Sequence, residues 1–239
     1  MSEATLAGVA AGLSRRLARL RFAPPVAYVY DPTVYARATN CAYLERYGAG
    51  RKEVVFFGMN PGPFGMTQTG VPFGAVSMVR DFLGIEGRVG RPKREHPKRP
   101  VEGFACARQE VSGMRLWSFV RERFGTAQAF FARCFIANYC PLLFLEAGGR
   151  NRTPVQLPAR EREPLLAACD DSLRAQIAIL RPRLVIGIGR FAEERARAAL
   201  GGLGVEIASI PHPSPASPAA NRGWAQQAER ALAELGIRV

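Results

Sequence analysis

Paired cysteines, long hydrophobic runs and histidine are scarce in this sequence of 239 residues. The five cysteines stand at irregular spacings and no two form a CxxC pair; they are Cys41, Cys106, Cys134, Cys140 and Cys169. An odd, scattered set argues against a disulfide framework, and the missing paired spacing argues against a zinc or iron–sulfur site. We therefore expect five reduced, mostly buried thiols, no metal and no cofactor.

Long apolar runs are also missing, and no segment approaches the length of a membrane-spanning helix. From Thr5 to Leu20, Leu, Val and Ala alternate with arginine at helical spacing, without the continuous apolar stretch of a signal peptide. We expect no membrane association, and we interpret residues 1–21 as an amphipathic helical segment at the edge of the domain.

Acidic residues are outnumbered: 33 Lys and Arg stand against 20 Asp and Glu, so the formal net charge is +13. Such an excess suits a protein that lies on a phosphate backbone, because each cation placed against a phosphate releases counterions. It suits equally a protein with a basic, well-solvated surface. Charge alone leaves both interpretations open.

The length, with 48% of residues hydrophobic, predicts one domain over residues 1–239. Short apolar runs predict strands at Glu53–Gly58, Phe131–Ala137, Arg183–Gly189 and Val205–Ile210. Helical periodicity predicts helices at Ala75–Leu83, Gly113–Phe124, Arg160–Leu180, Phe191–Leu200 and Gly223–Leu235. Strands that alternate with helices indicate an α/β fold, a parallel sheet covered on both faces. Its ligand site is expected in the loops after Gly58, Ala137 and Ile210, at the carboxyl ends of the strands.

One long segment, Gly84–Ser112, is rich in proline, glycine and charge. Its basic side chains are Arg88, Arg91, Lys93, Arg94, His96, Lys98 and Arg99. A solvated loop is one interpretation. A loop this long in a compact domain is often functional, so a phosphate-contacting loop is the other.

Three polar side chains stand in the loops expected to form the site. Asn60 lies in the glycine- and proline-rich run after the first predicted strand, where the backbone can approach a ligand closely. Asn138 follows the second strand, and His212, one of only two histidines, lies in a stiff proline-rich loop. Each has a structural alternative when taken alone: a turn asparagine, a loop cap or a structural histidine.

Two of these loops carry long motifs, GMNPGPFGMTQTGVPFG at 58–74 and HPSP at 212–215 followed by NRGW at 221–224. They resemble the uracil-DNA glycosylase superfamily, and in particular its single-strand-selective monofunctional branch. SMVRDFLGI, HPKRP, NYCPLLFL and LPARERE are also similar to that branch, so the resemblance runs from about Asp31 to Gly236. It implies a three-layer α/β/α domain with a central four-stranded, mostly parallel sheet.

The resemblance assigns a role to each matching position. Asn60 would position the attacking water, and His212 would stabilise the negative charge that develops on uracil O2. Phe73 would stack on the base and Asn138 would read its edge; the residues that line the pocket would be Met59, Gly62, Phe73 and Asn138. Contacts with DNA are implied for Gly149, Arg150, Asn151, Arg152, Thr153, Ser214, Pro215, Ala216, Ser217, Asn221 and Arg222.

These residue types suit the chemistry that the resemblance implies. The glycosidic bond breaks toward an oxocarbenium sugar and an anionic uracil, so charge stabilisation matters more than proton abstraction. A water held by an amide is then sufficient, and no lysine is placed for a Schiff base, which predicts a monofunctional enzyme. An amide at Asn138 matches uracil in one orientation and cytosine in the other. Gly62 leaves room beside C5 of the base, which suggests that 5-hydroxymethyluracil is accepted.

The expected partner is single- or double-stranded DNA that contains uracil, bound by a monomer. The expected location is the cytoplasm, on the nucleoid, in a bacterium, or the nucleus in a eukaryote. At Ala216 the chain departs from vertebrate members of the branch, which have a wedge arginine there. One rival is a non-catalytic DNA binder, which would be indifferent to Asn60 and His212. A Rossmann-like nucleotide hydrolase is disfavoured, because no P-loop or GxGxxG follows the first strand.

Overall fold

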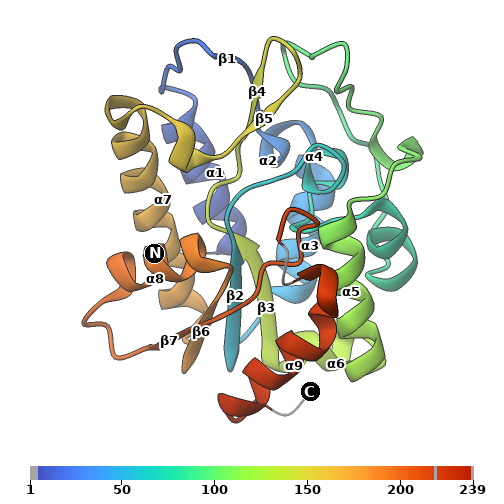
Figure 1. Cartoon of the computed structure of the whole chain (residues 1–239), viewed down its shortest axis with the longest axis vertical. Coiled ribbons are helices and arrows are strands. Elements are labelled where there is room, and N and C mark those ends of the chain that lie inside the picture. The colour runs from blue at the N-terminus through green and yellow to red at the C-terminus, as the bar shows by residue number, and fades with distance from the viewer. Residues whose placement is uncertain (1–4, 218–219, 238–239) are drawn as a thin grey trace.

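A four-stranded sheet forms the centre of the molecule (Figure 1). The computed structural model describes residues 5–217 and 220–237. The strands β2 (Val54–Gly58), β3 (Cys134–Asn138), β6 (Leu184–Ile188) and β7 (Glu206–Ile210) lie in the order β3-β2-β6-β7. All three neighbouring pairs are parallel. The four-stranded sheet predicted as mostly parallel is therefore confirmed, and it is parallel throughout.

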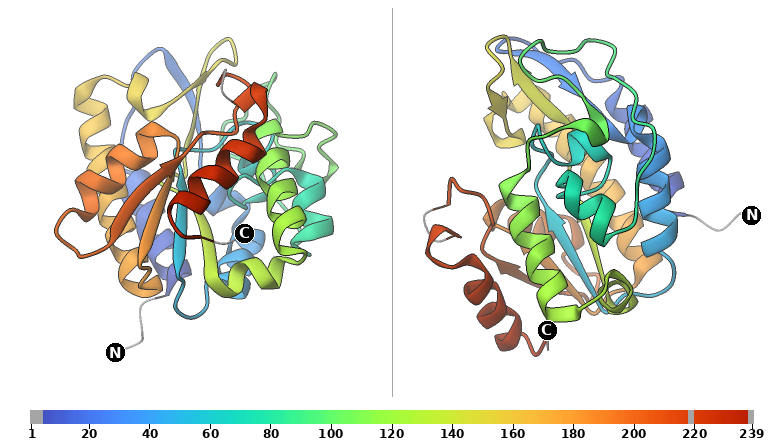
Figure 2. Two further views of the ribbon diagram at one scale, coloured as in Figure 1. Left: turned by 60° about the horizontal axis from the view of Figure 1, so that its bottom comes forward. Right: turned by 90° about the vertical axis from the view of Figure 1, so that its right-hand side faces the viewer.

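Helices cover both faces of this sheet, which gives the predicted three layers. Helices α1 (Leu6–Leu17), α7 (Ala159–Leu180) and α8 (Arg190–Leu200) pack on one side (Figure 1). Helices α5 (Val111–Phe124) and α9 (Trp224–Glu234) pack together on the other side (Figure 2). Every residue of β2 and β6 is buried. This two-sided burial explains why both strands are continuous apolar runs and do not alternate.

The structure corrects one predicted strand and one predicted helix. The strand expected at Phe131–Ala137 begins only at Cys134, because helix α6 (Ala127–Arg133) takes the first part of that run. The Thr126 side chain caps this helix by accepting a hydrogen bond from the backbone N–H of Ala129 (3.1 Å). The helix expected at Ala75–Leu83 is present over residues 76–82, but only Val76 and Ser77 are α-helical, and Met78–Phe82 form a π-helical turn.

The N-terminal segment forms the predicted amphipathic helix at the edge. Helix α1 buries Leu6, Leu13 and Leu17 and packs on α7. Its opposite face is exposed, and Arg16 there forms an ion pair with Asp171 of α7 (2.9 Å). An exposed pair of this kind contributes little to stability, so the buried leucines hold the helix in place.

A second, smaller sheet was not predicted. It consists of antiparallel strands in the order β1-β4-β5, with bounds Val26–Tyr30, Leu143–Glu146 and Asn151–Arg152. Short helices also escaped prediction: α2 (Pro32–Tyr35), α3 (Arg37–Tyr47), α4 (Met66–Thr69) and 3₁₀ turns at Gly103–Ala105, Pro154–Gln156 and Ala220–Arg222. Because β4 follows β3 after four residues, the small sheet stands beyond the carboxyl ends of the large one.

The basic segment Gly84–Ser112 is mostly irregular, but buried side chains hold it in place. Gln68 accepts hydrogen bonds from the backbone N–H groups of Glu102 (2.8 Å) and Gly103 (3.1 Å), and donates to the carbonyl of Pro100 (3.0 Å). His96 is buried, and one ring nitrogen lies 2.9 Å from the carbonyl of Ala147 in the β4–β5 turn. His96 therefore has a structural position, away from the loop at the end of β7.

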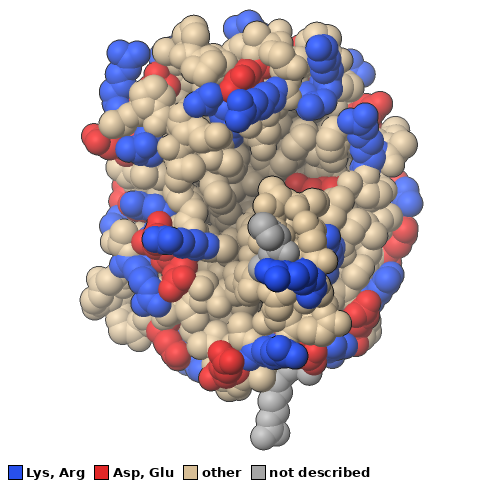
Figure 3. Space-filling model, viewed as in Figure 1, with Lys and Arg blue, Asp and Glu red and all other residues tan. Residues whose placement is uncertain are grey.

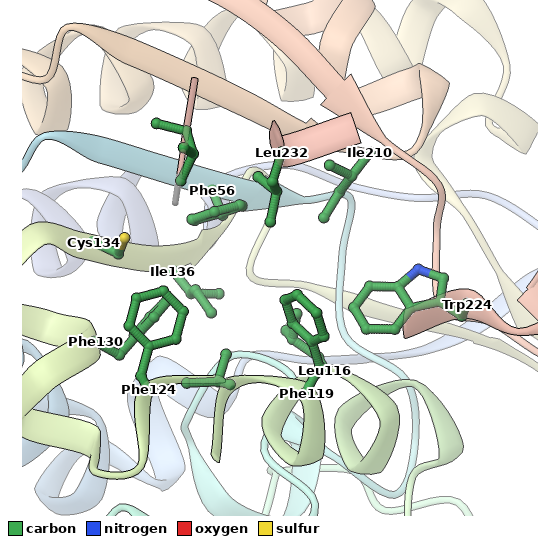
Figure 4. Close-up of a pocket in the computed structure, with 12 residues that line it drawn as sticks. Phe56, Leu116, Phe119, Phe124, Phe130, Cys134, Ile136, Ile210, Trp224 and Leu232 are labelled. Carbon is green, nitrogen blue, oxygen red and sulfur yellow. The ribbon is translucent and has the colours of Figure 1, made fainter. Parts of the chain in front are cut away.

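A narrow apolar gap of about 10 Å³ lies between α5, α9 and the large sheet. Figure 4 shows Phe56, Phe119 and Leu232 pointing into it. A gap of this size holds at most one water molecule, and its lining offers no polar group to bind one. It is a packing gap of the core, not a ligand site.

Four of the five cysteines are buried and all five are free thiols, as predicted. No group of three or more His, Cys, Asp or Glu residues within 5–217 and 220–237 is placed to hold a metal ion. In the same part of the chain, no helix combines the length and the apolar character needed to cross a bilayer.

Candidate active site

The loops that follow β2 and β3 run side by side. The two strands pair up to their last residues, Gly58 and Asn138. Beyond them the backbone N–H of Tyr139 donates to the carbonyl of Gly58 (2.8 Å), and that of Cys140 donates to the carbonyl of Met59 (2.9 Å). Asn138 and the loop that carries Asn60 are thereby fixed next to one another.

Gly58 is the point where two of the predicted site residues meet. A Cβ at this position would lie 2.6 Å from two atoms of the Phe73 ring and 2.7 Å from Oδ1 of Asn138. Both distances are shorter than any real Cβ contact, so a side chain here would displace the ring and the amide. The bare backbone of Gly58 allows Phe73 and Asn138 to share one small volume.

Asn60 lies two residues beyond β2 and is half-buried. Its Nδ2 donates to the carbonyl of Leu142 (3.1 Å), in the loop after β3. No described residue donates to its Oδ1. This bond fixes the amide and leaves one oxygen acceptor able to hold a water molecule.

Asn138 is oriented by a methionine. Its Nδ2 donates to Sδ of Met66 (3.3 Å), which is buried. A thioether sulfur accepts hydrogen bonds and never donates, so this neighbour favours the amide nitrogen facing it. The carbonyl oxygen then faces Gly58 and Phe73. The Asn138 amide therefore has one favoured orientation without any ligand.

Phe73 has a strained backbone with a φ of 53°, in the region that favours glycine. Such a conformation costs about 1–3 kcal/mol and persists only where its surroundings impose it. Here its carbonyl accepts hydrogen bonds from Nε1 of Trp117 (3.1 Å) and from the backbone N–H of Ala75 (2.8 Å). Gly113 of α5 lies directly against the same carbonyl. These contacts hold the Phe73 ring in a fixed position.

His212 lies two residues beyond β7, and its ring centroid is 6.1 Å from that of Phe73. It packs over Gly189, where a Cβ would lie 3.1 Å from Cβ of His212. The backbone N–H of Ser214 donates to Nδ1 (3.0 Å), so a neutral ring carries its proton on Nε2. Burial lowers the pKa of His212 below its ordinary value of 6.5. At neutral pH the residue therefore offers one N–H donor and no positive charge.

The loop that carries His212 is braced from two helices. Nε1 of Trp224, the first residue of α9, donates to the carbonyl of Pro211 (2.7 Å). From α5, Arg115 donates to the carbonyl of Pro213 (2.9 Å) and to Oδ1 of Asn221 (3.0 Å). The position of the imidazole thus depends on helices that reach this loop from outside it.

The segment Gly149–Thr153, expected to contact DNA, comprises the end of the turn between β4 and β5, the whole of β5 and the residue after it. Arg150 and Asn151 are exposed there. Arg152 is instead used within the protein, in an ion pair with Glu146 (2.7 Å) and a hydrogen bond to the carbonyl of Gln156 (2.8 Å). Thr153 belongs to a capping box with Gln156. Within this segment, Arg150 and Asn151 are therefore the side chains that remain open to a ligand.

The second expected DNA-binding segment, Ser214–Arg222, includes Pro218 and Ala219, which lie outside the described residues. Ser214 closes a tight turn, in which its carbonyl accepts from the N–H of Ser217 (2.9 Å) and its hydroxyl from that of Ala216 (3.2 Å). The exposed residues are Pro215, Ala216, Asn221 and Arg222. Figure 3 shows this face of the molecule hollowed near its centre, with lysine and arginine on both sides of the hollow.

Glu110 was missed by the sequence analysis. It directly precedes α5, and its carboxyl lies in the space that side chains at Gly62 and Gly65 would fill. Burial raises the pKa of this carboxyl to about 7. Neither glycine signals the contact in the sequence, because the partner is more than forty residues away along the chain.

Comparison with known proteins agrees with the motifs. The Uracil DNA glycosylase superfamily model matches residues 45–235 of the chain. The single-strand selective monofunctional uracil-DNA glycosylase of Rattus norvegicus is 54% identical over 227 residues, which cover 94% of this chain and 82% of the rat protein. The Mus musculus and Bos taurus proteins of that name are 53% and 52% identical, over 94% of this chain and 81% and 84% of their own lengths.

The fold has a similar solved structure. The crystal structure of wild-type Pedobacter heparinus SMUG2 superposes with a TM-score of 0.69 and covers 97% of each chain. Its sequence is 17% identical to this one, so the likeness concerns the fold alone.

We predict that His212 is neutral at pH 7, with its proton on Nε2. Its imidazole should titrate below pH 6.5, because burial disfavours the charged ring. Nitrogen-15 NMR of the imidazole signals reports both properties, and the His212→Ala variant assigns the signals. A midpoint above 6.5, or a proton on Nδ1, would contradict the arrangement.

We also predict that Glu110→Gln stabilises the protein at neutral and alkaline pH. The carboxyl keeps its proton to about pH 7 in the folded state but only to about 4.5, its ordinary value, when unfolded. The ionised form therefore destabilises the fold increasingly between these values and constantly above them. Tm of the variant relative to wild type should rise between pH 4.5 and 7 and then level off. A pH-independent difference would show that the carboxyl titrates normally.

Proposed function

The chain belongs to the uracil-DNA glycosylase superfamily, and from that premise we propose that it hydrolyses the N-glycosidic bond of uracil in DNA. It acts as a monofunctional glycosylase that starts base excision repair. The observation that carries this proposal is the meeting of Phe73 and Asn138 at Gly58, with His212 beside the ring and Asn60 in the adjoining loop. A single flipped pyrimidine nucleotide, bound here, would contact all four side chains.

Recognition begins with extrusion of the nucleotide, because a stacked base is out of reach of any side chain. Unstacking costs a few kcal/mol, and stacking of the base on Phe73 returns about 1–3 kcal/mol. Asn138 then accepts from N3–H through Oδ1 and donates to O4 through Nδ2. Cytosine reverses this pattern. It would leave buried polar groups unpaired at about 1–3 kcal/mol each, because Met66 opposes the flipped amide.

Hydrolysis needs a charge-stabilising donor and a positioned water. The bond between C1′ and N1 breaks, and its electron pair leaves with uracil. Nε2–H of His212 donates to uracil O2, where negative charge accumulates. A water held by Oδ1 of Asn60 adds to the oxocarbenium C1′ and releases its proton to solvent. A donor of this kind is typically worth about 10²–10³ in rate, and here it needs no reorientation during the reaction.

The DNA strand lies across the hollow face. Arg150, Asn151 and Arg222 are exposed and are available for phosphate contacts. Asn221 is exposed too, but its amide accepts from Arg115 (3.0 Å) and donates to the carbonyl of Pro215 (2.8 Å), so it holds the loop in shape. We further propose that both single- and double-stranded DNA are bound, by a monomer. At Ala216 the exposed turn presents a methyl group and no cation.

Gly62 supports a wider substrate range than uracil. It lies in the loop of Asn60, and it brings no side chain toward C5 of the base. We propose that 5-hydroxymethyluracil is excised, since its hydroxyl can replace an ordered water and keep that water's hydrogen bonds. The methyl group of thymine cannot form the hydrogen bonds of that water, so we expect thymine to be rejected.

The first test uses a uracil-containing oligonucleotide, single-stranded and paired, in EDTA, with abasic sites cleaved by alkali. We expect breaks only after alkali. Asn60→Ala should abolish them, and His212→Ala should slow single-turnover excision by about 10²–10³. Both variants should still bind the oligonucleotide and melt as wild type does. Binding by the wild type without breaks would identify a non-catalytic binder.

The second test compares three bases in one sequence context. Wild-type protein should release 5-hydroxymethyluracil at a rate within about tenfold of uracil, while thymine stays intact, because only the hydroxyl preserves the hydrogen bonds at C5. Release is measured by chromatography of the free bases. Equal inactivity on 5-hydroxymethyluracil and thymine, beside active uracil excision, would reject the wider range.

A further inference from the structure

The space beside Gly62 is not empty. A Cβ at Gly62 would overlap Oε1 of Glu110, and a Cβ at Gly65 would overlap Oε2. The two glycines of the GPFG segment therefore form a cradle for one carboxyl group. Their lack of side chains makes room for this group, which arrives from the start of α5.

The cradle is rigid. The hydroxyl of Thr67 donates to the carbonyl of Gly62 (2.7 Å), and Gln68 donates to the carbonyl of Pro63 (2.9 Å). The backbone N–H groups of Gln68 (2.8 Å) and Thr69 (3.2 Å) both reach the carbonyl of Gly65. A group placed against this segment meets a fixed wall.

The carboxyl in the cradle has no protein partner. Within residues 5–217 and 220–237, nothing forms a hydrogen bond or an ion pair with it, although the chain has 33 Lys and Arg. Burial is the only cause that raises the pKa of Glu110 to about 7. Glu110 is half-buried, so its carboxyl is removed from most of the solvent but can still be reached by a ligand. A carboxyl held in this way without a partner destabilises the fold, and such groups are concentrated where a ligand supplies the partner.

The base orientation proposed above sets the order of contacts around the ring. Going round the ring, O2 faces His212, N3–H faces Oδ1 of Asn138 and O4 faces Nδ2 of the same amide. The position after O4 is C5. The neighbour of that Nδ2 is Met66, which directly follows Gly65. The wall next to C5 is therefore the Gly62–Met66 segment, with the Glu110 carboxyl against it.

We propose that Glu110 is the specificity-determining residue for substituents at C5, and that it hydrogen-bonds the hydroxyl of a 5-hydroxymethyl group. This inference rests on the proposed base-excision function and on the base orientation given above. An ionised carboxyl accepts the hydroxyl proton, and a protonated one donates to the hydroxyl oxygen. With uracil, a water takes the hydroxyl's place. A methyl group displaces that water and leaves the carboxyl without a partner, so thymine is excluded.

The experiment measures single-turnover excision of uracil, 5-hydroxymethyluracil and thymine by wild type, Glu110→Met and Glu110→Gln. Methionine keeps the length of the side chain and removes both oxygens. We expect the ratio of 5-hydroxymethyluracil to uracil excision to fall about 5- to 150-fold in Glu110→Met, the range for a lost hydrogen bond to a buried group. The ratio of thymine to uracil should rise. Glu110→Gln keeps an acceptor and should hold the first ratio within about threefold of wild type.

The matched control is Glu122→Met, the same change at an exposed position of α5. It should leave both ratios as in wild type. A merely structural role for Glu110 would lower excision of uracil and 5-hydroxymethyluracil together, and an unchanged ratio in Glu110→Met would overturn the proposal. Wild type inactive on uracil would instead reject the proposed function, and wild type active on uracil alone would reject the wider substrate range.

A second measurement needs no variant. In a crystal of wild-type protein soaked with free 5-hydroxymethyluracil, the hydroxyl oxygen should lie within hydrogen-bond distance of Oε1 or Oε2 of Glu110. A base bound between Phe73 and Asn138 with its hydroxyl turned away from Glu110 would overturn the assignment even if Glu110→Met failed to fold.

Discussion

The bare backbone of Gly58 is the constraint on which the site depends. The last residue of β2 lies where the Phe73 ring and the Asn138 amide approach one another, and a Cβ there would lie within 2.7 Å of both. Parallel pairing puts Asn138 beside Gly58, because the carboxyl ends of the two strands coincide. The Phe73 ring and the Asn138 amide are therefore brought together by sheet geometry, and a single methyl group at Gly58 would separate them.

The site holds several groups that weaken the fold. Phe73 has a positive φ, His212 is half-buried with a lowered pKa, and the half-buried Glu110 carboxyl has no hydrogen-bond or ion-pair partner among the described residues. A neighbouring group holds each of them in place. The indole of Trp117 binds the carbonyl of Phe73, the backbone N–H of Ser214 binds His212, and the glycine cradle holds Glu110. Groups held in this way need no rearrangement when charge develops on the base. The pattern agrees with a preorganised site that is stabilised by the core around it.

The large positive charge does not mean that every arginine faces a phosphate. Glu53 joins Arg133 and Arg183 at the amino ends of the central strands, and these partners lower the pKa of its carboxyl. Arg152 neutralises Glu146, and Arg115 braces the loop of His212. Among the described residues, ten acidic side chains form ion pairs with arginine, half of the 20 Asp and Glu in the sequence. Figure 3 shows lysine and arginine side chains around the hollow on this face, with acidic side chains among them.

By itself the sequence determined the family, the central sheet and the identity of the polar residues at its carboxyl edge. Continuous apolar runs identified β2 and β6, because a strand buried on both faces has apolar side chains at every position. The family followed from the long and specific motif around Asn60. Only the tertiary structure decided which side chains meet. The small sheet pairs β1 with β4 across more than a hundred residues, Arg152 is taken up by Glu146, and Glu110 enters the space at Gly62. Such contacts between distant segments leave no local periodicity, so they exist only once the chain has folded.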